Sequence, residues 1–378
     1  MSEWPTVKLG DLGEFINGFA FKPSDWSEDG TPIIRIQNLT NPQALFNRTT
    51  KRVKDVLYVE PGDLLVSWSA TLGVFRWQGK ERAVLNQHIF KVVSKPIIEN
   101  EFLEFSLKFA LQQVEKYLHG ATMRHVNRRE FLDLKIPLPP LGEQKRIAEI
   151  LGGASKAINA IRTEIKRVES LCGAVVSLYA EDQSTKKLED LATLSGGLSL
   201  GSHRKNKPHS VGYLRVANVF WGKILYDEIK ELNCTDQEFE RTLLQDGDVL
   251  ITEAHANRFQ VGRSAVFRGE EQALVFQNHL FRARPNKNID SDVLAAMLSS
   301  VAVRRQLYQM AKTTSGLNTI SISQVRSLRV PVLDTTKQAE LLSFLQESNK
   351  LNHLLHRKLS LLQELQKSLA TRAFAGLL

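Results

Sequence analysis

The chain of 378 residues contains an internal repeat, and this feature constrains its fold more than any other. Five segments of the first half return in the second half in the same order. They are Lys8-Leu9-Gly10-Asp11-Leu12 with Lys187-Leu188-Glu189-Asp190-Leu191, Ile33-Ile34-Arg35 with Tyr213-Leu214-Arg215, Gly62-Asp63-Leu64-Leu65 with Gly247-Asp248-Val249-Leu250, Gln87-His88-Ile89-Phe90 with Asn278-His279-Leu280-Phe281, and Leu134-Lys135-Ile136-Pro137 with Leu328-Arg329-Val330-Pro331. The offset between partners only rises, from 179 to 180, 185, 191 and 194 residues. Chance likeness of short apolar strands would not keep this order, so the sequence indicates a duplication whose second copy gained loop insertions.

The first part of each copy has the pattern of a small mixed domain. Residues 1–140 and 182–334 are rich in short alternating apolar runs, such as residues 83–90, bounded by turn residues. This pattern predicts strands. One helix is expected inside each part, over residues 101–118 with Asn100 as N-cap and over residues 292–310 after Ser291. The predicted fold class is α+β, with two similar mixed α/β domains.

The second part of each copy has the pattern of a long helix. No proline occurs between Glu143 and Glu181, and apolar residues recur there at alternating spacings of four and three, as in the seam of a coiled coil. The seam residues that we single out are Ile147, Leu151, Ile158, Ile161, Ile165 and Val168 in the first helix and Leu341, Leu345, Leu355, Leu359 and Leu362 in the second. Residues 338–375 also carry Leu351, Leu354, Leu361 and Leu365 beside the stripe. This width predicts a helix that is covered on more than one side.

The order domain, helix, domain, helix predicts how the parts are arranged. If the two helices pair, the second must start where the first ends and run back, antiparallel to it. The division we predict is residues 1–140 and 182–334 as domains and residues 141–181 and 335–378 as helices. A helix from Ile147 to Tyr179 would be about 50 Å long. Half-sites on one face of B-DNA lie about 34–36 Å apart, so such a pair suits a two-site reader of DNA.

Several segments resemble the specificity subunit of type I restriction-modification systems, over essentially the whole chain. They are Lys8-Leu9-Gly10-Asp11-Leu12, the turn Pro61-Gly62-Asp63-Leu64-Leu65, the strand Asn86-Gln87-His88 and, most specific, Ile136-Pro137-Leu138-Pro139-Pro140-Leu141-Gly142-Glu143-Gln144. The second copy departs from the last motif, since Pro331-Val332-Leu333-Asp334 has one proline where the first copy has three. The repeat itself does not depend on those prolines.

The resemblance implies a role in a larger complex. Each domain would be a target recognition domain that reads one half of a bipartite sequence in double-stranded DNA. The paired helices would set the spacer between the halves and dock two methyltransferase subunits, and restriction subunits would join this core. S-adenosylmethionine, Mg and ATP are then expected in the partner subunits and not in this chain.

No catalytic motif is found in the sequence. The only Pro-Pro pair, Pro139-Pro140, lacks the amide and the aromatic ring of an adenine methyltransferase loop. Asp63 and Asp248 follow glycines in repeated turns, where aspartate is more simply a turn-former than a metal ligand. We therefore expect a non-catalytic chain without a metal site. Two alternatives stay open: an enzyme with an unrecognised site, and a coiled-coil scaffold whose domains bind protein.

DNA contacts are expected on loops of the two domains, because loops can vary without disturbing a core. Candidates are residues with amide, hydroxyl, guanidinium or amino groups in paired loops of the two copies. They are Gln37, Asn38, Ser67, Ser69, Thr71, Arg124, His125, Asn127, Arg128 and Arg129 in the first copy, and Arg204, Lys205, Lys207, Asn218, Asn257, Arg258, Ser315, Asn318 and Thr319 in the second.

Charge and cysteine content indicate which compartment and which kinds of partner to expect. The net charge of +9 favours an anionic partner without naming it. Two cysteines cannot form a disulfide framework, and no apolar run approaches the length of a membrane span. We expect a cytoplasmic protein that does not bind a membrane.

Overall fold

The computed structural model describes residues 4–41, 43–68, 71–118, 128–269, 273–314 and 316–378. The chain divides into two compact units, residues 1–162 with 357–378 (unit 1) and residues 163–356 (unit 2). Two helices of 40 residues, α5 (Leu141–Ala180) and α11 (Thr335–Phe374), each contribute residues to both units. They start close to the positions predicted from the apolar spacing.

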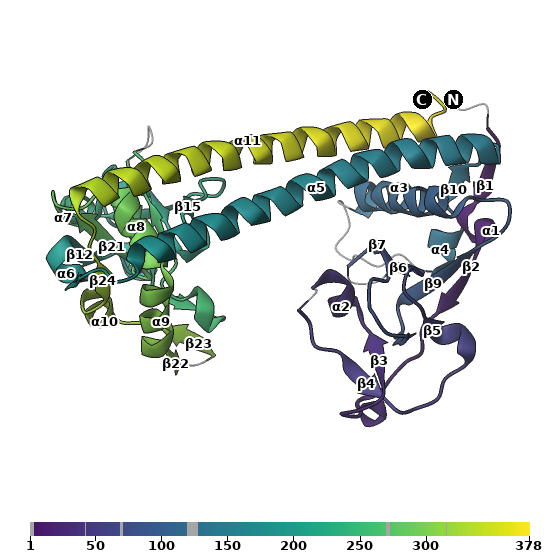
Figure 1. The fold of residues 1–378 in the computed structure, drawn as a ribbon, viewed down its shortest axis with the longest axis horizontal. Coiled ribbons are helices and arrows are strands. Elements are labelled where there is room, and N and C mark those ends of the chain that lie inside the picture. Colours follow the sequence, from purple (N-terminus) through teal and green to yellow (C-terminus); the bar gives the residue numbers. More distant parts are fainter. Residues whose placement is uncertain (1–3, 42, 69–70, 119–127, 270–272, 315) are drawn as a thin grey trace. The chain divides into compact units, whose positions relative to one another are not determined.

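Unit 1 is built on two four-stranded sheets (Figure 1). One sheet is antiparallel, in the order β2-β9-β6-β7, and the other has the order β4-β3-β8-β5 with β3 and β8 parallel. A two-stranded pair, β1 with β10, precedes α5. The elements are β1 (Thr6–Lys8), α1 (Leu9–Leu12), β2 (Gly13–Asn17), β3 (Thr31–Ile34), α2 (Ile36–Thr40), β4 (Asn47–Thr49), β5 (Tyr58–Val59), β6 (Leu64–Ser67), β7 (Gly73–Arg76), β8 (Ala83–Leu85), β9 (Ile89–Ser94), α3 (Asn100–Leu118), α4 (Arg128–Leu132) and β10 (Lys135–Pro137).

Unit 2 repeats this arrangement. Its sheet β12-β21-β17-β19 corresponds to β2-β9-β6-β7, its sheet β16-β13-β20 keeps one parallel pair, and β11 pairs with β24 before α11. The repeat read from the sequence is thus present in the fold. The elements are β11 (Thr185–Lys187), α6 (Leu188–Leu191), β12 (Ala192–Gly196), β13 (His209–Leu214), β14 (Val219–Phe220), β15 (Lys223–Ile224), β16 (Lys230–Cys234), α7 (Asp236–Thr242), β17 (Val249–Thr252), β18 (Ala254–His255), β19 (Ser264–Val266), β20 (Leu274–Phe276), β21 (Leu280–Pro285), α8 (Ser291–Ser299), α9 (Val301–Met310), β22 (Lys312–Thr314), β23 (Leu317–Thr319), α10 (Ile322–Arg326) and β24 (Arg329–Pro331).

The single helix predicted over residues 292–310 is wrong in one respect. The structure has two helices there, because Ser300 between α8 and α9 has an extended backbone with ψ 152°. The Ser300 hydroxyl donates to the Met297 carbonyl at 2.6 Å. The caps also differ from those predicted. The Glu99 carboxylate accepts from the Phe102 amide at 2.7 Å, and Asp290 caps α8.

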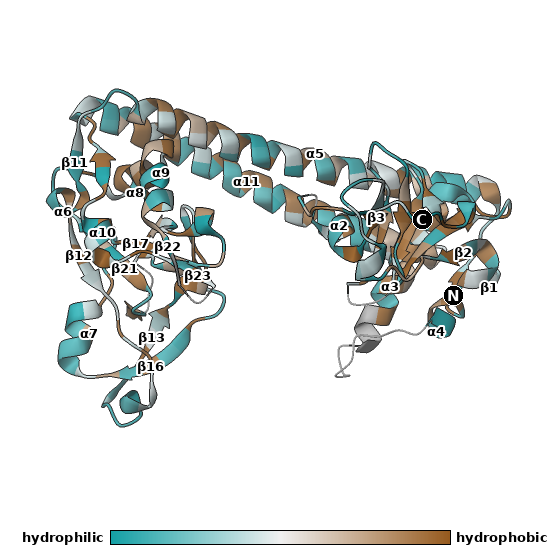
Figure 2. Ribbon diagram, turned by 90° about the horizontal axis from the view of Figure 1, so that it is seen from below, coloured by the Kyte–Doolittle hydropathy of each residue, from teal (hydrophilic) through white to brown (hydrophobic). Residues whose placement is uncertain are grey.

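The two long helices are antiparallel within each unit. In unit 1, the Gln366 amide donates to the Ser155 hydroxyl at 2.7 Å. Gln366 lies near the end of α11 and Ser155 near the start of α5. In unit 2, near the end of α5, the Tyr179 hydroxyl donates to Glu340 near the start of α11 at 3.1 Å. Hydrophobic and polar residues alternate along both helices (Figure 2), as the seam requires.

The helices belong to the cores of the units as well as to each other. Ile147, Leu151 and Phe374 lie in the main core of unit 1, and Val176 and Leu341 lie in that of unit 2. Of the seam residues predicted, Ile158, Ile165 and Val168 are also buried, and Ile161, Leu345, Leu355, Leu359 and Leu362 are half-buried. These side chains therefore hold the chain's own helices together and to their domains.

A pair of repeated glutamines joins each long helix to its domain. The buried Gln144 amide donates to the carbonyls of Ile97 and Pro139 and accepts from the Glu99 amide at 2.7 Å. Gln338 makes the same three kinds of bond, to Asn288, Leu333 and Asp290. Each side chain thus ties the first turn of a helix to two loops, which explains why Gln-initiated helices recur at this offset.

Candidate nucleic-acid interface

The turn after β3 and its counterpart in unit 2 are held by asparagines predicted to contact DNA. Asn38 accepts from the Arg35 amide at 3.0 Å and donates to the carbonyls of Ala44 and Leu45. Asn218 accepts from the Arg215 amide at 3.0 Å and donates to the Leu225 and Glu228 carbonyls. Both side chains are buried. A base contact would require these bonds to break, so their observed role is to shape the loops.

Two repeated aspartates have the turn role that the sequence favoured. Asp63 and Asp248 each accept from the backbone amide three residues earlier at 2.8 Å, beside Gly62 and Gly247 with φ of 94° and 86°. Asp63 also pairs with Lys91 at 2.7 Å. No group of three or more metal-ligating residues occurs among the residues that the structure describes.

In unit 1 the loop between β6 and β7 is organised by its first residues. The buried Ser67 hydroxyl donates to the Thr71 carbonyl at 2.6 Å, and the Thr71 side chain is exposed. The Trp68 ring lies 5.6 Å from the Phe90 ring in a stacked arrangement. Ser69 lies outside the described residues. Gln37, on α2, is exposed.

The basic segment before α4 is described only at its end. Arg124, His125 and Asn127 lie outside the described residues. Arg128 places its guanidinium 5.5 Å from the Phe90 ring centre and donates to the Phe15 carbonyl at 3.3 Å. The Arg129 side chain is 93% exposed and its ion pair with Asp133 is long, at 3.8 Å. Such an exposed pair holds the side chain weakly, so Arg129 can turn to an anionic ligand.

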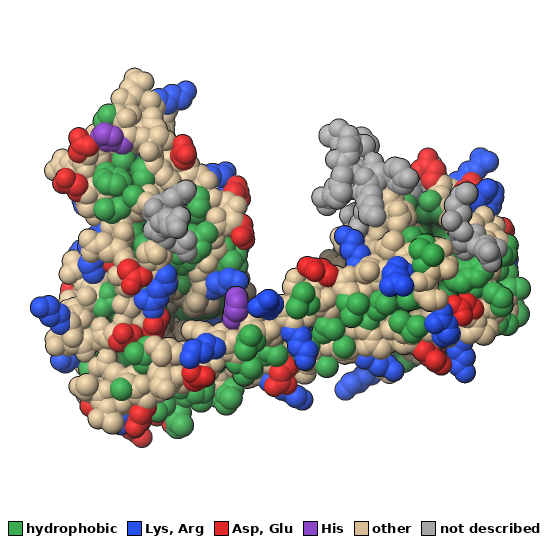
Figure 3. All heavy atoms as spheres, turned by 90° about the horizontal axis from the view of Figure 1, so that it is seen from above, with side chains coloured by type: hydrophobic (Ala, Val, Ile, Leu, Met, Phe, Trp, Pro, Cys, Tyr) green, Lys and Arg blue, Asp and Glu red, His purple; other side chains and the backbone are tan. Residues whose placement is uncertain are grey.

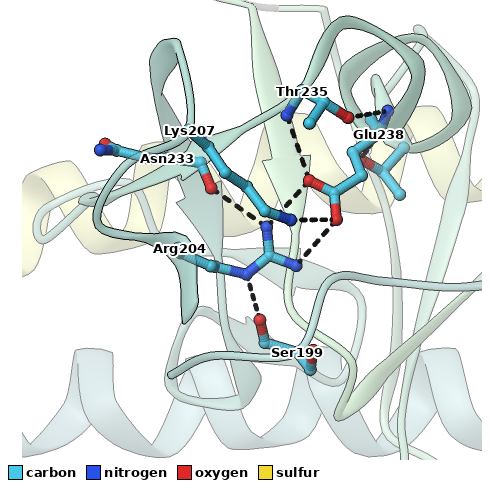
Figure 4. Close-up of polar contacts among 7 residues, drawn as sticks. Ser199, Arg204, Lys207, Asn233, Thr235 and Glu238 are labelled. Carbon is cyan, nitrogen blue, oxygen red and sulfur yellow. Dashed lines mark hydrogen bonds and ion pairs between the residues drawn. The ribbon is translucent and has the colours of Figure 1, made fainter. Parts of the chain in front are cut away.

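In unit 2 the basic loop of residues 201–207 contains an ion-pair cluster around the buried Arg204 (Figure 4). Arg204, in a short 3₁₀ helix (Ser202–Arg204), is 5% exposed and bonds to Glu238 at 3.2 Å and to the Asn233 carbonyl at 3.0 Å. Lys207 contacts the same carboxylate at 2.6 Å. The Lys207 hydrogen bond and, after it, those from Thr235 and Arg204 lower the pKa of Glu238 from 4.5 to about 2. Lys205 remains exposed.

The remaining candidates of unit 2 surround a small three-stranded sheet, β18-β23-β22. Asn318 and Thr319, predicted to lie on a loop, therefore belong to the strand β23. Asn318 on β23 is buried and donates to the Ala256 carbonyl at 2.9 Å, and the Thr319 hydroxyl is 3.5 Å from the Lys312 carbonyl. Asn257 is exposed and caps the 3₁₀ helix η5 (Arg258–Gln260) by accepting from the Phe259 amide at 3.0 Å. Ser315 lies outside the described residues.

Arg258, at the start of η5, is fixed by neighbours and still borders the surface. It donates to the Ala311 carbonyl at 2.8 Å, and its guanidinium lies 4.5 Å from the Tyr308 ring centre. Acidic and basic side chains are mixed over the face shown in Figure 3, without a large region of one sign. The exposed candidates are thus scattered polar groups on loops and on the short helices α2 and α4: Gln37, Thr71, Arg128, Arg129, Lys205 and Asn257.

A stripe of exposed leucines on α11 is a second surface. Leu351, Leu354, Leu361 and Leu365 recur at spacings of three, seven and four residues and therefore share one side of the helix. They are between 47% and 60% exposed, whereas Leu355, Leu359 and Leu362 of the predicted seam are half-buried. Hydrophobic side chains are visible along the long helices in Figure 3. The wide apolar stripe noted in the sequence is thus present on α11, and the side that carries these four leucines is exposed in the single chain.

Comparison with known proteins relates this chain to one family. Residues 1–170 match the family model described as "Type I restriction modification DNA specificity domain". The chain is 25% identical to the specificity subunit of the type I restriction enzyme EcoKI of Escherichia coli strain K12, over 99% of this chain and 89% of that one. It is 22% identical to the EcoBI specificity subunit of Escherichia coli, over 99% and 86%.

A solved structure extends the likeness to the fold of both units. A chain from a study of complex assembly and conformational transition of the type I restriction-modification system matches with a TM-score of 0.59 and 14% identity, over 99% of this chain and 98% of that one. Among the described residues, none of the helices has the length and apolar character to span a membrane. The family model covers the first copy, the fold repeats it in the second, and the curated relatives cover nearly all of the sequence. Over nearly its whole length the chain is similar to specificity subunits of type I restriction-modification systems, and residues 1–170 match the model of their DNA specificity domain.

Proposed function

We propose that this chain selects the DNA target of a type I restriction-modification complex, with each mixed domain reading one half of a bipartite sequence. The observation that carries the proposal is one scaffold with two different sets of loops. The main sheets of the two units have the same order, whereas the loops that follow β6 and β17 differ in length. Loops of different shape and chemistry on equivalent frames suit two different half-sites.

The residues proposed to touch DNA are those that the fold leaves exposed. Gln37 and Asn257 carry amides that suit base edges, and Arg129 and Lys205 suit phosphates or guanine. Arg128 and Arg258 are anchored at one side and border the same loops. Asn38, Asn218, Arg204 and Asn318 instead support the loops, because their polar groups are bonded inside the fold.

We propose two classes of protein partner. The paired helices dock two methyltransferase subunits, and the exposed leucine stripe of α11 supports this, because a stripe at helical spacing suits the apolar face of another helix. Restriction subunits complete the complex. S-adenosylmethionine, Mg and ATP belong to these partners in the proposal, and this chain contributes recognition and no catalytic step.

Exchange of one domain tests the reading role. Residues 1–140 are replaced by the corresponding domain of another specificity subunit, and the chimaera is expressed with its methyltransferase subunit. We expect one half of the methylated motif to change and the other half to stay, because each domain reads its own half-site. Methylome sequencing measures the motif. Exchange of residues 182–334 is the matched control and should alter the other half. A motif unaltered in both chimaeras would favour the scaffold alternative.

Deletion of one heptad from each long helix tests the spacer role. Seven residues are removed from residues 147–179 and seven from residues 341–373, in register, so that the seam is kept. The helices become about 10 Å shorter, which corresponds to about 3 base pairs. We expect methylome sequencing to find a shorter spacer between unchanged half-sites. A spacer of the original length would exclude the helices as its determinant.

A further inference from the structure

Unit 2 contains a surface pocket in which arginines and aromatic rings alternate. It is lined by Trp221 after β14, by Arg258 and Phe259 of η5, and by Arg304, Arg305 and Tyr308 of α9, over a floor that includes the buried Val261. We call it the arginine–aromatic pocket. Its volume of about 280 Å³ is near the lower end of the range for small-ligand sites. It is sized for a single small ring system and not for a helix or a strand.

The rings form a platform that is open to solvent. Phe259 and Tyr308 are stacked, with ring centres 4.7 Å apart and an angle of 26° between the planes. Phe259 is nevertheless 61% exposed. A ring fixed on one side and uncovered on the other can accept a second flat molecule against its free side. Such platforms are how proteins hold unpaired nucleobases.

The arginines give the pocket a positive rim. Arg258 lies over Tyr308 at 4.5 Å, and Arg304 lies over Trp221 at 5.0 Å. Within the described part of the chain, neither of them nor Arg305 forms an ion pair with a carboxylate. Three guanidinium groups without acidic partners attract an anion, and phosphate is the anion that flanks a nucleobase on a DNA strand.

Unused hydrogen-bonding groups lie in the same residues. The Trp221 Nε1 and Arg258 Nε atoms are buried and have no hydrogen-bond partner among the described residues. A buried donor without a partner costs free energy, and a bound ligand with acceptor atoms can remove that cost. The pocket thus combines a stacking surface, a positive rim and unsatisfied donors.

The pocket is a feature of the second copy. In unit 1, seven residues connect Val66 to its pairing partner Val74, and in unit 2 twelve residues connect Ile251 to Ser264. The longer connection contains β18 and η5, and therefore Arg258 and Phe259. Asn257, which is proposed to contact DNA, directly precedes them. An insertion that adds a pocket to a recognition loop is expected to serve recognition.

We propose that the arginine–aromatic pocket binds one unstacked nucleobase of a DNA strand, with the base against Phe259 and the flanking phosphates on Arg304 and Arg305. The inference rests on the proposed DNA-reading function and deepens it, because it assigns unit 2 a preference for DNA with an unpaired base. An apolar protein segment is a poorer occupant, since it would leave the three guanidinium groups without counter-charges.

Single-stranded DNA binding by the full-length chain tests this assignment. The probe is a fluorescent oligothymidylate, measured by anisotropy beside a fully paired duplex of equal length. We expect Phe259→Ala to weaken binding of the single strand about 5- to 100-fold, because one stacking contact is lost. The paired duplex should lose less than about 2-fold. Phe259→Trp is the matched control and should retain the affinity, since it keeps a flat ring.

A second variant keeps the test independent of the fold of η5. Arg305 is exposed, so Arg305→Gln should leave the stability unchanged, weaken single-strand binding and reduce the slope of log affinity against log salt by about 1. A wild-type chain that does not bind the single strand, or variants that bind it as the wild type does, would overturn the assignment.

These results separate the pocket from the wider function. If the domain exchange changes the methylated motif while Phe259→Ala and Arg305→Gln have no effect, the reading function stands and the pocket assignment falls. If both variants lose single-strand binding while the exchange leaves the motif unaltered, the pocket stands and the reading function falls.

Discussion

Replacing Glu238 by alanine is expected to lower the free energy of unfolding of unit 2 by about 2–3 kcal/mol. The carboxylate on α7 is the shared partner of Arg204 and Lys207, and Arg204 is 5% exposed. Removal of the carboxylate leaves a buried guanidinium without its counter-charge, which is the costly way to break such a cluster. The expected loss is at or below the usual range of about 3–5 kcal/mol, because the Glu238 side chain is one quarter exposed. Urea denaturation of the full chain, followed by circular dichroism, measures the difference.

Glu240→Ala is the matched control for this prediction. Glu240 lies on the same helix and is exposed, and its replacement should change the stability by less than about 0.5 kcal/mol. Equal effects of the two substitutions would mean that the cluster does not stabilise the fold.

The same cluster predicts how the stability of the fold changes with pH. The pKa of Glu238 is lowered from 4.5 to about 2 in the folded chain, so its carboxylate contributes stability that is complete above pH 4.5. This contribution is lost as the pH falls from there through about 2, where the folded state also takes up the proton. The stability difference between wild type and Glu238→Ala should therefore shrink below pH 4.5. A difference that stays constant on acidification would contradict the lowered pKa.

Two charges on the leucine stripe of α11 are expected to prevent assembly with the methyltransferase subunits. In the variant Leu354→Lys with Leu361→Lys, a partner helix docked as proposed would have to bury two ammonium groups in place of two leucines. Each buried leucine is worth about 1.5–3 kcal/mol, so affinity should fall more than about 100-fold. The fold itself should be little affected, since both leucines are exposed. Co-purification of the coexpressed subunits, followed by titration of the purified components, measures the loss.

The control adds the same charges elsewhere on the helix. Asn349 and Ser360 are exposed and lie away from both the seam and the leucine stripe, so Asn349→Lys with Ser360→Lys should leave assembly intact. Loss of assembly in both double variants would point to a general effect of charge on α11. Retention in both would remove the stripe from the docking surface.

Local sequence patterns were sufficient to predict the architecture. The repeat, the proline-free helices and the order of the parts predicted two like domains and an antiparallel helix pair, and these are present within the units. The prediction was possible because the spacing of apolar residues along a helix or a strand indicates which side is buried. Where one backbone angle decided the outcome, as at Ser300 between α8 and α9, the same pattern missed the break.

The candidate interface depended far more on tertiary structure. Asn38, Asn218 and Arg204 have the side chains of DNA-binding residues, and the fold uses their hydrogen bonds internally. Phe259 and Tyr308 are 49 positions apart in the chain, and only the packing of η5 on α9 stacks them. The sequence by itself determined the frame, because secondary structure follows from periodicity over neighbouring residues. The tertiary structure decided which polar and aromatic groups remain free to bind, because a hydrogen bond or a ring contact between distant segments leaves no periodic trace in the sequence.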